Sequence, residues 1–327
     1  MNRPGRRTDI ALTAAFVLLA LFPLAGSTFY VQLLTKIMVM AIFAMSLDLL
    51  VGHVGLVSLG HAAFFGIAGY TLALLSPQYE AASLWTTLPA AIAVCAAFAL
   101  VTGALVLRTS GIYFIMVTLA FAQMAYFVFH DTALGGGSDG IYIYVKPQMK
   151  LAGVSLLDLD QLGHFYYLVL LLMTLVYASL RRMLRSPFGH ALAGIRANEH
   201  RMNSLGYPTF RYKLAAYVIA GALAGVSGYL AALQFGFVNP EILSWHNSGI
   251  VLMMVILGGM GTLHGAVIGA FAMVLLQEVL ANQAWFGEAA KHWQLAMGVL
   301  IVLVALFLPR GLAGIAWRAR KAAGDGR

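Results

Sequence analysis

The sequence predicts an all-α polytopic membrane protein. Of its 327 residues, 61% are hydrophobic and only 10% are charged, and the mean hydropathy is +0.86. Charged residues make up about a quarter of a typical soluble globular domain. A bilayer core about 30 Å thick is crossed by about 20 apolar residues in a helix, and apolar runs of this kind recur through the whole chain. The composition therefore excludes a soluble globular protein.

About ten transmembrane segments are expected. In chain order they cover residues 10–26, 31–51, 56–75, 88–107, 112–130, 164–180, 212–233, 245–257, 266–281 and 293–308. The first resembles a secretory signal, but its apolar run exceeds the roughly 7 to 15 residues of a signal core, so we expect it to be retained. The third carries closely spaced glycines, which permit tight helix packing or a broken or re-entrant helix.

Basic residues orient these segments, because Lys and Arg in short loops stay on the cytoplasmic side. With a cytoplasmic N-terminus, 16 of the 20 Lys and Arg residues fall on that side. An even number of segments then places both termini in the cytoplasm. We expect a permease-like membrane domain at 1–317, with an external loop at 131–162 and a cytoplasmic loop at 181–211, followed by a basic tail at 318–327. The same bias accounts for the net charge of +8 without a nucleic-acid partner.

The chain shows no pattern of a catalytic or metal site. Its nine histidines include no HExxH pair, and Cys95 is the only cysteine. The run GGGSDG (135–140) lacks the Lys-Ser/Thr ending of a phosphate-binding loop. We therefore expect a non-catalytic chain without a metal or nucleotide site of its own.

One cytoplasmic stretch, SPFGHALAGIRANEHRMNSLGYP (186–208), is unusually rich in charge for this chain. Ser186 is placed to cap a helix that starts at Pro187, and Gly206 is placed to end it. The apolar positions fall roughly on one face and are Leu192, Ile195, Met202 and Leu205. Two interpretations stay open from periodicity: an interfacial helix lying on anionic headgroups, or a docking helix that enters a groove on a cytosolic partner.

Polar and aromatic residues inside the segments are candidates for a solute path. In the third segment they are Ser58, His61, Phe64 and Phe65, and in the fifth they are Tyr113 and Gln123. A hydrogen bond between helices explains such residues equally well. Asp48 is the carboxylate deepest inside a segment. We expect its charge to be stabilised by pairing with Arg108, by a helix N-terminus, or by snorkelling to the interface.

Several blocks in order resemble the Liv-type branched-chain amino acid ABC transporter permeases, and within them the larger, M-like subunit. The blocks are SLGHAAFFGIAGY (58–70), SGIYFIMVTLAFAQM (110–124), GGGSDG, SPFGHALAGIRANEHRMNSLG with FRYKLAAYVIAGALAG (186–225), and LGGMGTLHGAVIGA (257–270). They spread over about two-thirds of the chain. The resemblance implies that the stretch before Gly206 couples the permease to its ATPase, which favours the docking interpretation. The coupling residues it implies are Phe188, Gly189, Leu192, Ile195, Arg196, Glu199, Met202, Leu205 and Gly206.

The resemblance also implies a function and an assembly. The chain would be the permease subunit of an ATP-driven importer in the bacterial inner membrane. It would work with a paralogous permease, two cytosolic ATPases that bind ATP and Mg²⁺, and an external solute-binding protein that delivers branched-chain or other hydrophobic amino acids. Urea or amides and small carboxylates are alternatives within the family, and an ion-coupled secondary transporter is the alternative of another class. Asp48 is the one candidate for the buried ionisable relay that such a transporter needs.

The chain departs from the family pattern at two places. Where ABC permeases show a Glu-Ala-Ala-xxx-Gly pattern, counting back from Gly206 gives His200, Arg201 and Met202. His264 and Ala266 stand where Trp and Pro are expected. The first change predicts a more basic contact with the partner, and the second leaves any role of the 257–270 block in substrate choice open.

Overall fold

The computed structural model describes residues 14, 16–24, 26–77, 79–151, 154–308 and 311–314. Within these residues the chain is mainly helical, which confirms the predicted all-α class. The predicted basic tail, 318–327, lies outside the described residues, and so does the start of the first predicted segment.

Six helices are long and apolar enough to cross a membrane. They are α2 (Thr28–Asp48) with the π-helix Leu49–Val54 that continues it, α4 (Leu84–Val106), α5 (Ile112–Asp131), α6 (Leu162–Leu184), α9 (Thr209–Phe235) and α11 (Leu263–Leu280). Three shorter apolar helices are α3 (His61–Leu75), α10 (Trp245–Gly258) and α13 (Trp293–Phe307). Residues 16–21 of the first predicted segment are also helical. Every predicted segment therefore contains helix, and the number of membrane crossings stays a prediction.

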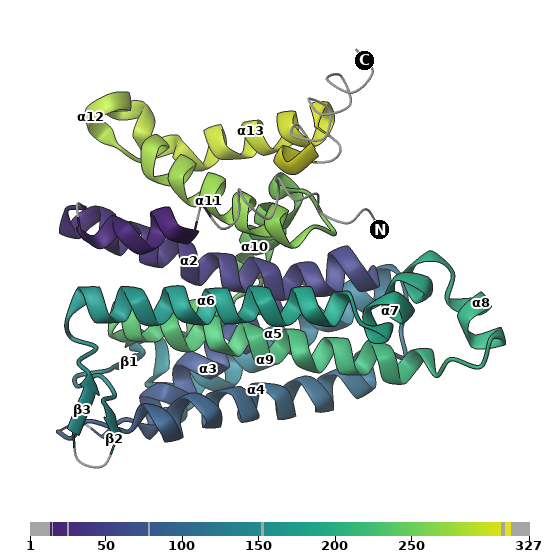
Figure 1. Ribbon diagram of the computed structural model, residues 1–327, viewed down its shortest axis with the longest axis horizontal. Coiled ribbons are helices and arrows are strands. Elements are labelled where there is room, and N and C mark those ends of the chain that lie inside the picture. The colour runs from purple at the N-terminus through teal and green to yellow at the C-terminus, as the bar shows by residue number, and fades with distance from the viewer. Residues whose placement is uncertain are drawn as a thin grey trace.

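The connections at the two ends of the bundle differ in kind. At one end lie α7 (Pro187–Ala197) and α8 (Glu199–Ser204). At the other end β1 (Ile141–Tyr142) pairs antiparallel with β4 (Phe237–Val238), and β2 (Met149–Leu151) pairs with β3 (Val154–Leu157). Figure 1 shows α7 and α8 at one end of the long axis and β1 to β3 at the other. The predicted loops 131–162 and 181–211 thus lie at opposite ends of the bundle.

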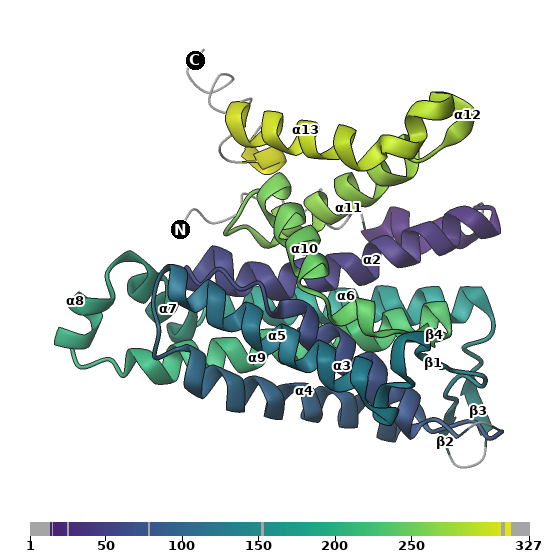
Figure 2. The same ribbon diagram turned by 180° about the vertical axis from the view of Figure 1, so that it is seen from behind.

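The helices form a main bundle with an additional layer on one side. Helices α3, α4, α5, α6 and α9 surround one side of α2, while α10, α11 and α13 lie on its other side (Figures 1 and 2). The short helix α12 (Gln283–Phe286) joins α11 to α13. Residues 41–50 of α2 and its continuation are all buried. A helix that is apolar all round is expected in such a central position, so α2 is the core element against which the other layers pack.

Small residues bring α9 close to its neighbours. A Cβ atom on Gly221 would lie 2.8 Å from the Ala99 Cβ, one on Gly225 would lie 2.8 Å from the Cys95 Sγ, and one on Gly228 would lie 1.9 Å from the Phe65 carbonyl oxygen. The three glycines share one face of α9 because they are spaced four and three residues apart. This close approach of backbones is typical of helix packing in membranes.

The third predicted segment, 56–75, is a broken one. The π-helix ends at Gly55, whose φ of 85° lies in the left-handed region. Residues 55–60 are not helical, and α3 begins only at His61. The predicted helix was therefore too long at its start, because the glycine spacing reflects a chain break as well as close packing. The 15 residues of α3 extend about 22 Å, which is shorter than the bilayer core.

Candidate coupling site and solute path

The stretch 186–208 folds into two short helices where the sequence predicted one. Asn198, with φ −162° and ψ 100°, interrupts the helix and caps α8, because its side-chain oxygen accepts a hydrogen bond from the Arg201 N–H at 2.9 Å. Gly206, with φ 84°, follows α8 as predicted. The start at Pro187 is also confirmed. Ser186 does not cap the helix with its side chain; its hydroxyl donates to the Met183 carbonyl at 2.6 Å.

Helix α7 turns its apolar face toward its own protein. Leu192 is fully buried and Ile195 is 3% exposed. The outer face carries His190, Ala193 and Ala197, all exposed. The prediction that Leu192 and Ile195 enter a partner's groove does not fit this packing, because both are already covered. An interfacial helix with its apolar face in the lipid does not fit either.

Two further predicted coupling residues support the fold of the α6–α7 junction. A Cβ on Gly189 would lie 2.3 Å from the Leu184 carbonyl oxygen, so only glycine permits this tight turn between α6 and α7. Phe188 stacks on Tyr212 of α9, with ring centroids 5.5 Å apart. Both residues therefore position the start of α7.

Helix α8 is fastened to α7 and α9. Glu199 forms an ion pair with Lys213 at 2.6 Å, and the Thr209 hydroxyl lies 3.1 Å from the Glu199 carboxylate. Met202 packs against Gly194, where a Cβ would lie 2.8 Å from its sulfur. Leu205, in contrast, is 65% exposed. Glu199 and Met202 therefore support the shape of the loop, whereas Leu205 is available to a partner.

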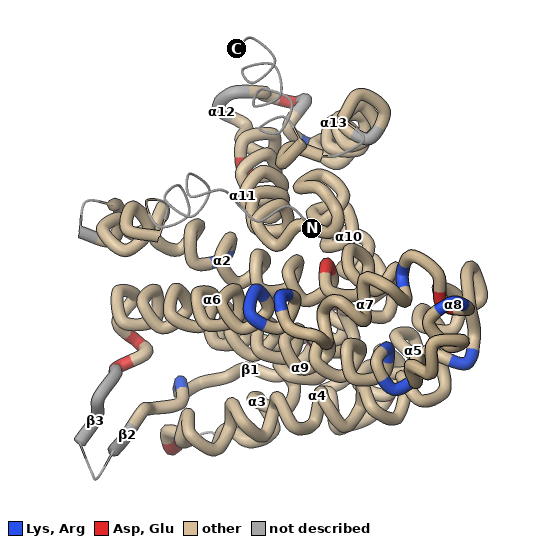
Figure 3. The backbone as a smooth tube through the Cα atoms, turned by 45° about the vertical axis from the view of Figure 1, so that its right-hand side comes forward, with Lys and Arg blue, Asp and Glu red and all other residues tan. Residues whose placement is uncertain are grey.

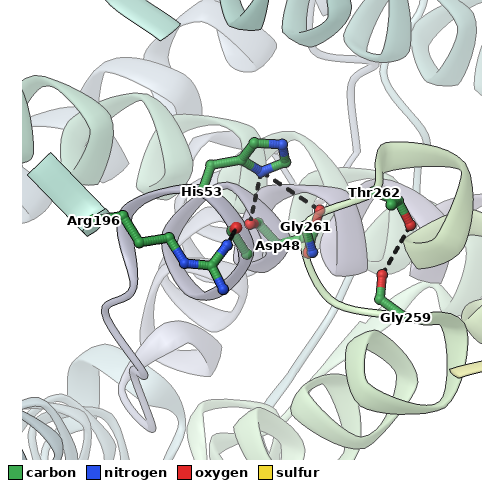
Figure 4. Close-up of polar contacts among 7 residues, drawn as sticks. Asp48, His53, Arg196, Gly259, Gly261 and Thr262 are labelled. Atoms are coloured by element: carbon green, nitrogen blue, oxygen red, sulfur yellow. Dashed lines mark hydrogen bonds and ion pairs between the residues drawn. The ribbon is translucent and has the colours of Figure 1, made fainter. Parts of the chain in front are cut away.

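Arg196 links the loop 181–211 to the core of the bundle. Its guanidinium donates a hydrogen bond to the Gly52 carbonyl oxygen in the π-helix, and its aliphatic part lies against Gly55 (Figure 4). A π-helical turn leaves backbone carbonyls with altered partners and is frequent at functional sites. The contact joins α7 to the end of α2 directly.

Asp48 lies at the same junction, on the last turn of α2. Its side chain is fully buried, and its Oδ1 accepts a hydrogen bond from the Gly261 N–H at 2.8 Å. Its Oδ2 lies 3.7 Å from the His53 Nδ1. Figure 4 shows Asp48, His53 and Arg196 converging on the turn between α10 and α11. The expected pairing with Arg108 is wrong, and complete burial excludes snorkelling.

Charge is concentrated at this end of the molecule. Figure 3 shows most of the described Lys and Arg residues around α7, α8 and the adjoining ends of α6 and α9. Among the described residues, no group of three His, Cys, Asp or Glu side chains could hold a metal ion. The site is thus a basic, folded loop that is tied to a buried carboxylate and a glycine turn.

The residues predicted for a solute path fall into two groups. Ser58 and His61 are fully buried, Phe64 is 1% exposed and Phe65 is 6% exposed. Tyr113 on α5, in contrast, is 69% exposed, and Gln123 is partly buried. The first group alone shares one buried region.

His61 forms a hydrogen bond between helices, which was the alternative to a role in a solute path. Its Nε2 lies 2.9 Å from the Ser46 hydroxyl, which itself donates to the Phe43 carbonyl at 2.7 Å. Because a hydroxyl has one proton to donate, His61 is the donor to Ser46 through Nε2–H. Its Nδ1 is buried without a hydrogen-bond partner. The ring stacks on Phe43 with an interplanar angle of 12°.

The broken start of α3 is completed by its neighbours. The Ala62 N–H donates to the Ser248 hydroxyl of α10 at 2.8 Å, and the Leu59 N–H donates to the Thr118 hydroxyl of α5 at 3.3 Å. The Gly60 N–H donates to the Ser58 hydroxyl at 3.2 Å. These bonds satisfy amide groups that a helix start leaves free. Ser58 therefore serves the local backbone.

Sequence reasoning did not identify Gly52, His53 and Gly261 as parts of one junction. Each lies in a glycine-containing run that was interpreted locally, GHVG (52–55) and GGMG (258–261). Their joint role depends on a contact between residues more than 200 positions apart, Asp48 with Gly261. No spacing within either run predicts that contact.

A polytopic helical membrane protein with a basic folded loop at one end is the class that this arrangement defines. The family model described as branched-chain amino acid transport system, permease component, matches residues 29–306. That match covers most of the chain, and the chain belongs to this family.

Curated relatives agree with the family. The chain is 33% identical over 325 residues to the high-affinity branched-chain amino acid transport system permease protein LivM of Salmonella typhimurium, covering 94% of this chain and 75% of the relative. The LivM protein of Escherichia coli matches to the same extent. The xylose transport system permease protein XylH of Escherichia coli is 26% identical over 145 residues, covering 43% of this chain and 36% of the relative. No solved structure matches significantly. The protein is therefore a permease subunit of an importer system.

Proposed function

We propose that this chain is the membrane subunit of an ATP-driven importer that moves branched-chain or other hydrophobic amino acids delivered by an external solute-binding protein. The observation that carries the proposal is the family match over residues 29–306, supported by the LivM relatives that align with 94% of the chain. The partial similarity to a xylose permease means that fold alone does not select the solute. Urea or amides and small carboxylates stay as alternatives within the family.

The importer needs an ATPase that this chain does not carry, so the folded loop 181–211 is proposed as its docking site. The exposed residues of the loop form the contact surface, since Leu192 and Ile195 are covered by the chain itself. The outer face of α7 is narrow because Ala193 and Ala197 are small, and exposed Leu205 and Tyr207 follow α8. Exposed apolar residues beside basic ones are typical of a protein contact.

The assembly and the topology follow from the same proposal. A second, related permease subunit and two ATPases that bind ATP and Mg²⁺ would complete the complex. The basic end with α7 and α8 would face the cytoplasm of a bacterium, and β1 to β4 would face the external binding protein. Ten membrane crossings, with residues 1–317 as the permease domain and both termini inside, agree with the opposite placement of the two loops.

A substitution at Leu205 tests the proposed function. Leu205→Asp should weaken ATPase binding by about thirtyfold or more, because a charge in an apolar contact costs about 2 kcal/mol. Pull-down of the ATPases and ATP hydrolysis stimulated by leucine-loaded binding protein in proteoliposomes are the measurements. Leu134→Asp is the matched control for the pull-down, since Leu134 is 56% exposed in the loop at the opposite end of the bundle.

Two outcomes would count against the proposal in different ways. If the unmodified chain neither binds an ATPase nor supports leucine uptake, the importer function itself is wrong. If Leu205→Asp binds the ATPase as well as the control does and hydrolyses ATP like the unmodified chain, the loop is not the docking site.

A further inference from the structure

A cavity of about 220 Å³ lies between α2, α3, α9, α10 and α11. Its walls are mostly apolar and include Met40, Phe43, Phe65, Val251, Met254 and Val274. Its volume is below the roughly 300 to 1,000 Å³ of sites for drug-sized ligands. The space therefore suits a small solute with an apolar part.

Three polar side chains line the same cavity and come from three different helices. Lys36 is on α2, Asn247 on α10 and Gln277 on α11. Each shares a helical face with apolar lining residues, since Lys36 is followed by Met40 and Phe43 at spacings of four and seven. Every helix thus contributes an apolar stretch and one polar group.

These polar groups lie at similar distances along their own helices from one junction. The last turn of α2 meets the turn between α10 and α11, where Asp48 bonds to Gly261. Measured along the helix axes from that junction, Lys36, Asn247 and Gln277 lie about 18, 16 and 21 Å away. On α2, Lys36 therefore lies farther from the junction than Met40 and Phe43 do. The side chains of Lys36, Asn247 and Gln277 are together called the polar layer of the cavity.

The polar layer has capacity for a ligand. Among the described residues, Lys36 has no carboxylate within ion-pair distance, although it is only partly exposed. The Gln277 amide makes no hydrogen bond to any part of the chain that the structure describes. The Asn247 amide donates to the Glu241 carbonyl at 2.9 Å, which leaves its oxygen as an acceptor.

The cavity is adjacent to the loop that we assign to the external side. Phe237 of β4 and Ile242 also line it, and β4 pairs with β1 of the loop 131–162 through Ile141 and Val238. A solute released at that end reaches the polar layer before the apolar walls.

We propose that the cavity binds a small aliphatic carboxylate, with Lys36 holding the carboxylate group and the aliphatic part lying against the packed rings of Phe43 and Phe65, whose centroids are 4.6 Å apart. For an amino acid, the amide oxygens of Asn247 and Gln277 accept hydrogen bonds from the ammonium group. A charge-assisted bond from an ammonium to a carboxylate is the strongest polar contact available here. The assignment rests on the proposed importer function for its biological solute, but its chemistry depends only on the cavity.

A competing explanation is that Lys36 reaches toward lipid headgroups as an anchor. That explanation predicts no dependence on solute. It also gives no role to the two amide side chains that line the same cavity. Binding by a carboxylate can therefore be distinguished from anchoring by measuring protection of the cavity.

The test uses the full chain in lipid nanodiscs, with Ile250→Cys as a probe on the cavity wall in a Cys95→Ser background. Leucine and 4-methylpentanoate should slow labelling of the probe by a thiol reagent, and 3-methylbutylamine, which lacks the carboxylate, should not. Lys36→Met should raise the leucine concentration needed for half-protection by about ten- to a hundredfold. Lys36→Arg should restore most of the protection.

Lys291→Met is the matched control. Lys291 is 60% exposed, is paired with Glu288, and lies in the connection between α12 and α13. It should leave protection unchanged. Equal protection in Lys36→Met and in the unmodified chain, or protection by the amine alone, would overturn the carboxylate site. Absence of protection by every solute would overturn the cavity as a binding site. Failure of leucine uptake in proteoliposomes, with protection retained, would instead count only against the importer function.

Discussion

Gly52 lies where α2, its π-helical continuation and the α10–α11 turn meet, and Gly52→Ala tests whether this contact holds the junction together. A Cβ at this position would lie 2.2 Å from the Asp48 Oδ1 and 2.4 Å from the Gly261 nitrogen. The Gly261 backbone cannot turn aside like a side chain, and it is already held at φ 80°. The carboxylate of Asp48 would have to move away and lose its bond to the Gly261 N–H.

The cost of Gly52→Ala has three parts. Loss of a partner by a buried polar group costs about 1 to 3 kcal/mol, and overpacking of a tight core costs about 1 to 3 kcal/mol. Alanine's helix preference over glycine returns about 1 kcal/mol. We therefore expect the variant to be less stable by about 1 to 5 kcal/mol. Thermal unfolding of the purified chain in detergent, followed by loss of monodisperse protein, is the measurement.

Gly298→Ala is the control for Gly52→Ala. Gly298 lies in α13, and a Cβ there would meet no atom within 4 Å. The control should be as stable as the unmodified chain or slightly more stable. If Gly52→Ala melts at or above the temperature of the control, the junction tolerates a methyl group and the reasoning from close contact is refuted.

Two further predictions concern the ends of the bundle. In a Cys95→Ser background, a cysteine replacing exposed Ser138 should react with an impermeant thiol reagent applied to intact cells. A cysteine replacing exposed His200 should react only after the membrane is opened. The reverse pattern would invert the proposed orientation. Arg196→Met should lower the stimulation of ATP hydrolysis by solute-loaded binding protein about tenfold, because it removes a charge-assisted bond to the Gly52 carbonyl. ATPase pull-down should stay normal in that variant, and an unchanged ratio of stimulated to basal hydrolysis would show that this bond does not transmit coupling.

The membrane helices were predictable because bilayer physics acts on local composition. An apolar run long enough to cross a membrane has few alternatives to a helix. The segments predicted at 88–107 and 112–130 therefore correspond closely to α4 and α5. The start of α7 at Pro187 and the stop at Gly206 were likewise local signals. The conformations of these residues depend on their own chemistry more than on distant partners.

The direction in which α7 faces could not be predicted in the same way. An amphipathic pattern with Leu192 and Ile195 on one face shows that the face is covered, but not by what. The structure covers it with the chain's own core. The closely spaced glycines allowed a broken helix, but the position of the break before His61 could not be predicted for a related reason. The amides of Leu59 and Ala62 find their acceptors on Thr118 and Ser248, far away in sequence.

The polar groups of the cavity were also missed, because each was unremarkable within its own segment. Lys36 lies near the start of α2, where a lysine close to the end of a membrane helix is common. Gln277 lies near the end of α11, where interfacial residues are expected. Only the arrangement of α2, α10 and α11 brings them to one cavity.

Helix α2 connects the proposed binding cavity to the proposed docking loop. Its residues Lys36 and Phe43 line the cavity, while Asp48 and the adjoining Gly52 contact the α10–α11 turn and Arg196 of the loop 181–211. Burial of residues 41–50 makes α2 a rigid element that cannot bend without disturbing its neighbours. A movement of α7 at the ATPase would therefore reach the cavity through one helix, over about 20 to 25 Å. In this arrangement Asp48 contributes as a fixed joint between helices, which explains a fully buried carboxylate without a proton relay.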